Sequence, residues 1–290
     1  MPRDPSARVG WKAGLLSILV PGLGHVYAGD PRRGGVYFCA SVVLAYAVVP
    51  LARFDGLNAT SFGIVAALLL VVRVTAILDA ARIAGSAGST YQLRRYNRWY
   101  VYVGATLIAT LLMLPTRLAA RPYRIPSGAM LPTLQIGDDI ITNSIAYSRT
   151  PPVRGDIVVF RYPGNRDETY IKRIIGLPGE TIAIHQRRVS VNGQEIDDPW
   201  GFCPDGRAVR DGAADCGPAV HRLDEMAPVT LGADEYFVLG DNRQRSQDSR
   251  IWGAVPKADL LGKAIGVYWS WDGDHHFPRL GRTGQSLEPE

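Results

Sequence analysis

The sequence predicts a membrane-embedded α-helical region at the N-terminus, followed by a mainly β domain outside the cytoplasm. Two observations support this prediction. Apolar residues crowd positions 1–116, and short runs rich in Val, Ile, Tyr and Phe, separated by turn residues, fill most of the remaining chain. We place the helical region at 1–122, the β domain at 123–277 and a polar, poorly ordered tail at 278–290.

Three segments approach the roughly 20 apolar residues that a helix needs to cross a bilayer. They are Gly35 to Leu51, Phe62 to Leu78 and Tyr100 to Pro115. An earlier apolar stretch, "AGLLSILVPGLGHVYAGD", contains a proline, several glycines and His25, an interruption typical of a kinked or re-entrant helix. Three and four crossings therefore both stay open.

Two polar groups belong to the second apolar segment. Arg73 lies within it and Asp79 follows it. Because charged groups are costly in lipid, we expect both side chains to face other helices or to reach toward an interface.

The chain is basic, with 32 Lys and Arg against 27 Asp and Glu and a net charge of +5. Much of the excess lies beside hydrophobic segments, which favours an anionic membrane surface over nucleic acid as the partner. No zinc-finger spacing, RNP-like motif or Walker loop supports nucleic-acid binding. Lys and Arg near membrane helices are retained in the cytoplasm, so the arginines at 82, 94, 95 and 98 mark a cytoplasmic loop. The chain after Pro115 is then extracytoplasmic with either number of crossings.

Three cysteines are too few for a disulfide-built scaffold. Cys39, inside an apolar stretch, is expected to be unpaired. Cys203 and Cys216 would close a short loop in an oxidising compartment, and that disulfide would stabilise the fold by roughly 3 kcal/mol.

Lys172 interrupts an apolar, strand-like run in "YIKRIIGLPGE". Strand alternation puts Lys172 and Arg173 on opposite faces, so we expect one of the two cations to point inward. A desolvated lysine has a lowered pKa and can act as a general base, whereas arginine cannot lose its proton. The alternative is an edge-strand lysine whose amine reaches solvent.

The stretch "LGDNRQRSQDSRIWG", residues 239–253, packs hydroxyls, carboxylates and arginines closely together. Taken alone, it is typical of a turn-rich loop in which Asp248 and Arg250 are a candidate ion pair. The same density of polar groups also suits a shell that orients a reactive amine.

The motifs "IPSGAMLPTLQIGD", "GDIVVF", "YIKRIIGLPGE" and "LGDNRQRSQDSRIWG", in this order behind membrane helices, closely resemble those of bacterial type I signal peptidases, or leader peptidases. The resemblance covers roughly residues 123–271. It implies a multi-pass serine endopeptidase of the bacterial cytoplasmic membrane, with a mainly β catalytic domain on the outer face. Such an enzyme removes signal peptides from exported preproteins with a serine-lysine dyad. The implied partners are signal peptides and the lipid bilayer, and neither a cofactor nor a metal is expected.

The resemblance also assigns roles by position. Lys172 resembles the general base, and Ser246 the hydroxyl that orients its amine. Ser127 resembles the serine whose hydroxyl helps to form the oxyanion hole. The supporting residues are Asp241, Asn242, Arg243, Asp248 and Arg250. The positions that line the apolar substrate pockets are Ile125, Pro126, Met130, Leu134 and Ile171, for which core packing is the alternative.

The catalytic serine of the family aligns with Ala129, which has no hydroxyl to attack a carbonyl. Four explanations stay open. They are an engineered Ser→Ala substitution, a natural non-catalytic relative that binds signal sequences or membrane partners, Ser127 as a substitute nucleophile, and an active site elsewhere. In an extended segment Ser127 and residue 129 share a face but lie about 6.6 Å apart, the rise of two strand residues. Lys172 would have to move or reach to serve Ser127. No Gly-x-Ser-x-Gly or His-Glu-x-x-His motif supports a different site.

Overall fold

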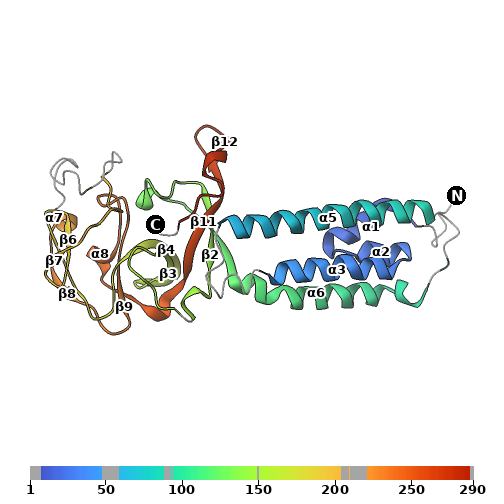
Figure 1. Ribbon diagram of the computed structural model, residues 1–290, viewed down its shortest axis with the longest axis horizontal. Helices are drawn as coiled ribbons and strands as arrows, with labels where there is room; N and C mark the ends of the chain where they lie inside the picture. Colours follow the sequence, from blue (N-terminus) through green and yellow to red (C-terminus); the bar gives the residue numbers. More distant parts are fainter. Residues whose placement is uncertain are drawn as a thin grey trace. The chain divides into compact units, whose positions relative to one another are not determined.

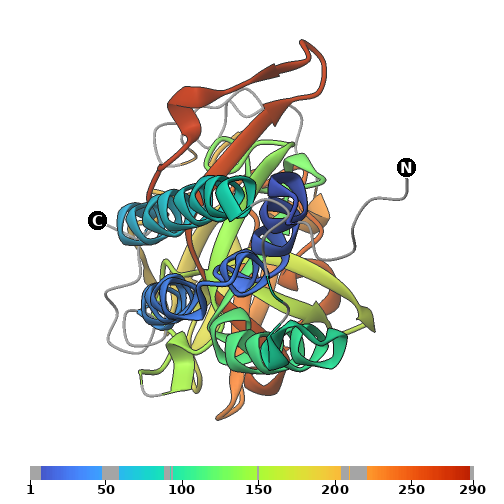
Figure 2. The same ribbon diagram turned by 90° about the vertical axis from the view of Figure 1, so that its right-hand side faces the viewer.

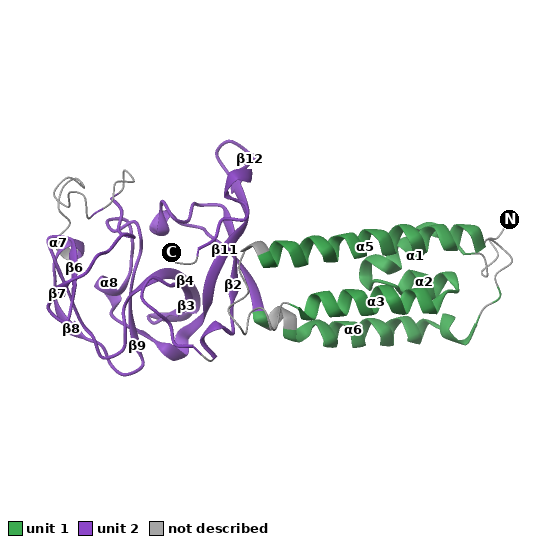
Figure 3. Cartoon of the chain, viewed as in Figure 1, with its two compact units in different colours: residues 1–56, 61–119 green, residues 57–60, 120–290 purple. Residues whose placement is uncertain are grey.

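The computed structural model describes residues 8–47, 59–87, 92, 94–148, 150–203, 209 and 221–287. It divides into two compact units (Figure 3). The helical unit comprises residues 1–56 and 61–119, and the β unit comprises residues 57–60 and 120–290. The two are joined without a break where α6 ends at Ala119 and β1 begins at Ala120.

The helical unit contains helices at the positions of the three predicted apolar segments and two shorter helices before them. Its helices are α1 (Gly10–Leu19), α2 (Leu23–Ala28), α3 (Pro31–Tyr46), α5 (Ala59–Ala87) and α6 (Trp99–Ala119). Within the described part of the chain, one helix is long and apolar enough to cross a membrane, over Ser61–Ala87, and Trp99–Pro115 forms a shorter apolar helix. The number of crossings stays a prediction.

The interruption after α1 is built by close backbone packing. Gly22 adopts a φ of 92°, and a Cβ on it would lie 2.0 Å from the carbonyl oxygen of Gly34, so only glycine fits. The chain reverses here into α2, which lies between the longer helices when they are viewed end-on in Figure 2.

The two polar groups of the second apolar segment face neighbouring helices, as expected. Arg73 donates from Nη1 to the carbonyl oxygen of Ile18 at 3.0 Å, at the carboxyl end of α1. Asp79 pairs with the fully buried His25 at 3.1 Å. These contacts tie α5 to α1 and α2 and satisfy groups that lipid would leave unpaired.

The β unit is built from two antiparallel sheets (Figure 1). The larger sheet has the order β1-β2-β11-β3-β4-β9-β10, with β12 paired to β11, and the smaller has the order β7-β6-β5-β8. The strands are β1 (Ala120–Arg124), β2 (Asp138–Asn143), β3 (Ile157–Tyr162), β4 (Asn165–Gly176), β5 (Thr181–His185), β6 (Arg188–Val191), β7 (Gln194–Glu195), β8 (Met226–Thr230), β9 (Glu235–Leu239), β10 (Val255–Pro256), β11 (Leu260–Asp272) and β12 (Phe277–Pro278). Two short helices, α7 (His221–Asp224) and α8 (Ser249–Trp252), complete the unit.

Strand β3 shows how the core is divided. Its side chains alternate between two apolar clusters, Ile157 and Val159 in one, Val158 and Phe160 in the other. A strand buried on both faces reads as a continuous apolar run, which explains "IVVF" in the sequence. The neighbouring strand β4 is therefore held at the centre of the sheet, where Lys172 lies.

The prediction of a poorly ordered C-terminal tail is wrong for the residues that the structure describes. We expected residues 278–290 to be polar and poorly ordered, but the described part, through Leu287, packs along β11. Leu287 joins the core, and the backbone N–H of Gly284 donates to the carbonyl oxygen of Val267 at 2.8 Å. Arg282 forms an ion pair with the buried Asp138 at 2.6 Å. One apolar and one charged side chain thus anchor a segment whose composition is otherwise polar.

The cysteines follow the predicted division in part. Cys39 is free and exposed. Cys203 is buried and disulfide-bonded. Cys216, its predicted partner, lies outside the described residues, so that pairing stays a prediction.

Candidate active site

The segment that carries Ala129 is a short turn between two buried anchors. After β1, Ile125 pairs with the chain before β2, accepting from the N–H of Gly137 at 3.0 Å. The single 3-10 turn Gly128–Met130 follows, and Met130 is fully buried. Ser127 is exposed and Ala129 is half-buried. The core therefore fixes both ends of the turn and leaves position 129 accessible.

A second segment, residues 240–246 after β9, closes onto this turn. The backbone N–H of Asn242 donates to the carbonyl oxygen of Ala129 at 3.1 Å, and its side-chain amide donates to that of Gly128 at the same distance. A Cβ on Gly240 would lie 2.5 Å from the Ala129 oxygen and 2.2 Å from Ser246 Oγ. Segments more than 100 residues apart in sequence therefore meet at Gly240.

Lys172 lies on β4, against which the Ala129 turn packs. Its side chain is 5% exposed, and Nζ donates to the carbonyl oxygen of Ile171 at 2.9 Å. Burial lowers the pKa of Lys172 to about 8, although the carboxylates of Asp248 and Asp241 act to raise it. At pH 7 about a tenth of the amine is then neutral and able to accept a proton.

Arg173 is buried as well, which differs from the expectation that one of the two cations would be inward. Its guanidinium donates to both carboxylate oxygens of Asp241, at 2.8 and 2.7 Å, and lies 5.3 Å from the ring of Trp200. A buried cation is tolerated when a carboxylate satisfies it, and this pair provides that. Because adjacent residues of a strand point to opposite faces, Lys172 and Arg173 are buried on opposite faces of the larger sheet.

Asp241 also links the strand to the turn. Besides Arg173, it accepts a hydrogen bond from Thr133 Oγ1 at 2.6 Å. Thr133 lies three residues after the end of the Ala129 turn, so one carboxylate joins β4, the 240–246 segment and the chain that follows the turn.

Asp248 and Arg250 form the predicted pair and shape the end of the same segment. Arg250 donates to the two Asp248 oxygens at 2.8 and 2.7 Å. Asp248 also caps α8 and accepts from the N–H of Gly240 at 3.0 Å, while Arg250 donates to the carbonyl oxygen of Arg243 at 2.6 Å. The hydroxyl of Ser246, inside this frame, is buried and has no hydrogen-bond partner in the described part of the chain.

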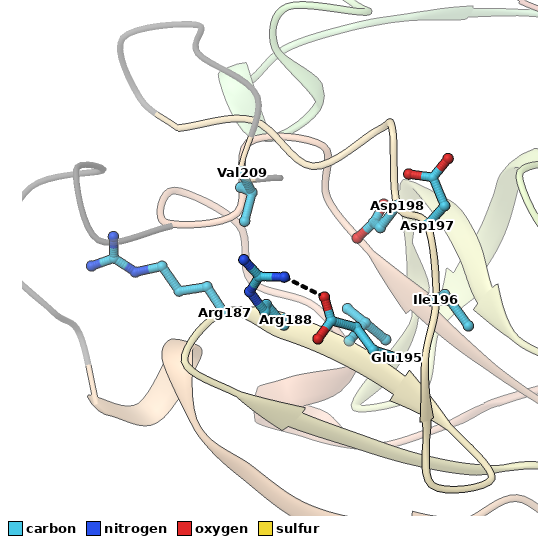
Figure 4. A pocket seen from close by; sticks show the side chains of 8 residues that line it. Arg187, Arg188, Glu195, Ile196, Asp197, Asp198 and Val209 are labelled. Atoms are coloured by element: carbon cyan, nitrogen blue, oxygen red, sulfur yellow. Dashed lines mark hydrogen bonds and ion pairs between the residues drawn. The ribbon is translucent and has the colours of Figure 1, made fainter. Parts of the chain in front are cut away.

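Arg243 ties the segment to the chain that follows β7. It is fully buried, which acts to lower its pKa, but its bidentate pairing with Asp198 raises the pKa above the ordinary value. Asp198 borders a hollow of about 310 Å³ near β6 and β7 that contains none of the predicted catalytic residues (Figure 4). The other lining residues are Arg187, Arg188, Val189, Glu195, Ile196, Asp197 and Val209.

The predicted substrate-lining residues separate into two groups. Ile125, Met130 and Leu134 are buried in one apolar cluster, which is the core-packing alternative. Pro126 is exposed, and Ile171 is partly buried beside the same cluster. Pro126 and Ile171 are thus the members of the predicted set that remain accessible to a ligand.

Two residues that the sequence did not single out, Thr133 and Asp198, contribute to the site, and so does Arg173, whose partner the sequence did not reveal. Arg173 and Thr133 lie inside the quoted motifs, but nothing in their local pattern identifies Asp241 as their shared partner. Asp198 lies 45 residues before Arg243 and outside every motif. Opposite charges that lie this far apart in the sequence leave no local pattern from which their pairing could be predicted. Only the folded structure shows these pairs.

Comparison with known proteins places this geometry in a family. Residues 96–269 match the family described as "Signal peptidase, peptidase S26". The sequence is 37% identical over 202 residues to probable signal peptidase I-2 of Synechocystis, covering 67% of this chain and 81% of that protein. It is 35% identical over 199 residues to signal peptidase I of Pseudomonas aeruginosa, covering 56% and 70% respectively. It is 35% identical over 176 residues to signal peptidase I of Bacillus caldolyticus, covering 61% and 92%.

A crystal structure of signal peptidase I from Enterococcus faecalis is 30% identical in sequence, covers 39% of this chain and 97% of its own, and gives a TM-score of 0.30. The family match spans more than half of the sequence. The chain belongs to the signal peptidase family S26, whose members named above are serine endopeptidases of the signal peptidase I type. The match begins at Tyr96, so α1 to α5 precede the matched region.

Proposed function

We propose that this chain is a membrane-bound signal peptidase I whose β unit lies outside the cytoplasm and acts on signal peptides of exported preproteins. One observation carries the proposal. The buried Lys172 lies on the strand against which the Ala129 turn packs, and the 240–246 segment clamps that turn. This is the arrangement that a lysine base and a nucleophile on the turn require.

The mechanism follows for a chain with serine at 129. The neutral Lys172 amine takes the proton from the serine Oγ as this oxygen attacks the scissile carbonyl. The backbone N–H of residue 129 and the Ser127 hydroxyl donate to the oxyanion. The Lys172 ammonium then protonates the leaving amine, and an acyl-enzyme forms. A water molecule, deprotonated by Lys172, hydrolyses the ester and regenerates the serine.

Substrate binding is proposed at the edge of the larger sheet. Strand β1 is terminal in that sheet, and an extended peptide can pair with an exposed strand edge. Pro126 and Ile171 would contact small apolar side chains near the cleavage point. Trp269 is partly exposed and Trp271 half-buried on β11, positions suited to a lipid-water boundary.

The membrane arrangement is proposed to be multi-pass, in the bacterial cytoplasmic membrane, with three or four crossings. The apolar faces of α3 and α6 support it, since Val36, Leu107 and Leu111 are each more than 60% exposed. Side chains of this kind are stabilised by lipid rather than by water.

The test is cleavage of a preprotein in detergent by the full chain and by Ala129→Ser. We expect no cleavage by the chain as given, cleavage by the serine variant, and loss of that cleavage when Lys172→Met is added. Cleavage by the chain as given, abolished by Ser127→Ala, would instead establish Ser127 as the nucleophile and contradict the assignment of position 129.

A second candidate function is supported by Ala129 itself. The turn is clamped at both carbonyls although it lacks a hydroxyl, so a peptide-binding surface can persist without catalysis. If Ala129→Ser does not cleave a preprotein that the chain still binds, the chain is a non-catalytic signal-sequence-binding protein. Fluorescence anisotropy with a labelled signal peptide measures that binding independently of cleavage.

A further inference from the structure

One face of α3 forms a shallow apolar trough that the proposed function does not use. Its volume is about 770 Å³, and its lining residues recur every three or four positions along the helix. They are Arg32, Gly35, Val36, Cys39, Ala40, Val43 and Leu44. Val36 and Val43 are each 69% exposed, so the described helices leave this face uncovered. Gly35, Cys39 and Ala40 form its low floor between larger side chains.

The trough has a charge at one end only. Arg32 lies at the N-terminal end of the trough, and every other lining residue is uncharged. The next residue, Arg33, pairs with Asp30 at 3.2 Å and with Asp79 at 3.6 Å. Arg32 forms no ion pair with any described residue, so its guanidinium is available to an external anion. The first turn of α3 contributes partial positive charge at the same end.

The dimensions match half of a bilayer. From Arg32 to Leu44 the helix rises by about 18 Å at 1.5 Å per residue, close to half of the roughly 30 Å hydrocarbon thickness. A cation at one end of an apolar strip of this length is complementary to an anionic headgroup joined to one acyl chain. Basic pockets beside membrane helices recognise such headgroups on the cytoplasmic side, where the arginines place this end.

We propose that the α3 trough binds an anionic phospholipid of the cytoplasmic leaflet, with its phosphate on Arg32 and an acyl chain along Gly35 to Leu44. This inference rests on the proposed membrane placement of the helical unit. It does not depend on cleavage, because the lipid is measured directly.

A second copy of the chain is the competing occupant of this face, and charge argues against it. Both copies would have the same orientation in the membrane, so a symmetric contact between two α3 helices would set Arg32 against its counterpart. Like charges so placed repel, whereas a phosphate neutralises the guanidinium. A symmetric contact would also bring the two free Cys39 thiols together, which gives a direct test.

The experiment uses the full chain extracted from vesicles of equal parts phosphatidylglycerol and phosphatidylethanolamine, with retained lipid measured by native mass spectrometry. We expect preferential retention of phosphatidylglycerol, reduced about fivefold by Arg32→Gln, the effect of one cation near the membrane surface. Arg82→Gln removes an exposed cation from α5, outside the trough, and is expected to keep the preference. Ala40→Trp, which fills the floor without changing charge, is expected to reduce retention of both lipids.

Two results would overturn the proposal. The first is equal retention of the two headgroups, or a preference that Arg32→Gln leaves unchanged. The second is efficient Cys39 disulfide cross-linking of two chains in the same vesicles under mild oxidation, absent in Cys39→Ser, which would assign the face to a second copy. Loss of cleavage in Ala129→Ser would leave both measurements unaffected, so failure of the proposed activity is distinguishable.

Discussion

The charge of Lys172 is buried without a direct carboxylate partner, since no acidic group of the described chain lies within ion-pair distance. Desolvation therefore lowers the pKa of the amine from 10.5 to about 8. In the proposed mechanism the neutral amine is the base, so the cleavage rate of Ala129→Ser should rise with pH and level off above about 8. A pH profile of kcat measures this. A rate independent of pH between 6 and 9 would contradict the assignment of Lys172.

The same burial predicts a stability effect. The folded pKa lies below the unfolded value, so the unfolded chain binds more protons between about pH 8 and 10.5, and stability rises with pH across that window. Below pH 8 the penalty is full, about 3 kcal/mol for a shift of this size. Lys172→Met should therefore raise the melting temperature at pH 7 and lose this advantage by pH 10.5. Lys257→Met, at an exposed position, is the control and should leave the melting temperature at pH 7 unchanged.

Gly240 has a role that depends on its missing side chain. A Cβ there would meet Ser246 Oγ and the Ala129 carbonyl oxygen at 2.2 and 2.5 Å, so Gly240→Ala must displace the turn, the hydroxyl or both. A displacement near 1 Å can cost about 100-fold in rate. We expect Ala129→Ser with Gly240→Ala to cleave ten- to 100-fold more slowly than Ala129→Ser alone. Gly273→Ala, where a Cβ meets nothing within 4 Å, is the control.

At the scale of elements, the chain after β12 holds β2 in place through one ion pair. Asp138 is fully buried, which acts to raise its pKa, but hydrogen bonds from Arg282 and Ser270 lower it below the ordinary value. Arg282→Met would leave a buried carboxylate unpaired, at a cost of about 3–5 kcal/mol in unfolding free energy. Because the folded pKa is lowered, this stabilisation is present above the unfolded pKa and is lost as pH falls.

A double-mutant comparison separates the pair from general packing. Asp138→Asn combined with Arg282→Met removes both charges, so it should destabilise the β unit by less than Arg282→Met alone. Thermal denaturation monitored by circular dichroism at pH 7 measures both. Equal destabilisation in the single and double variants would show that Arg282 acts through packing instead.

The elements also show how far the sequence predicts the fold. The apolar helices and short strands follow from hydrophobic patterning, and the interruption of an apolar run pointed to Lys172. The burial of Arg173 could not be predicted in this way, because its partner Asp241 lies 68 residues away. Composition likewise indicated a loose tail, whereas two side chains, Arg282 and Leu287, anchor it. Local patterns identify elements, but long-range charge pairs are decided by the fold.

At the scale of the whole molecule, the site depends on segments that meet only in the folded chain. The Ala129 turn, Lys172 on β4 and the 240–246 segment are joined through Asp241, Asn242 and Gly240. The family motifs predict which residues form the site, and the fold brings those residues together from distant positions in the sequence. Ala129 leaves this framework intact, because its backbone carbonyl, which accepts from Asn242, needs no side chain.

The orientation of the whole chain is the final prediction. Because Lys and Arg near membrane helices are retained in the cytoplasm, we expect the connection between α5 and α6 to be cytoplasmic and the β unit to lie outside the cytoplasm. In a Cys39→Ser background, Arg95→Cys and Arg166→Cys introduce thiols at exposed positions on these two sides. A membrane-impermeant maleimide added to intact spheroplasts should label the cysteine at 166 and leave that at 95 unlabelled until the membrane is permeabilised. The opposite pattern would invert the orientation and place the β unit in the cytoplasm. There it could not reach a preprotein that has already been translocated across the membrane.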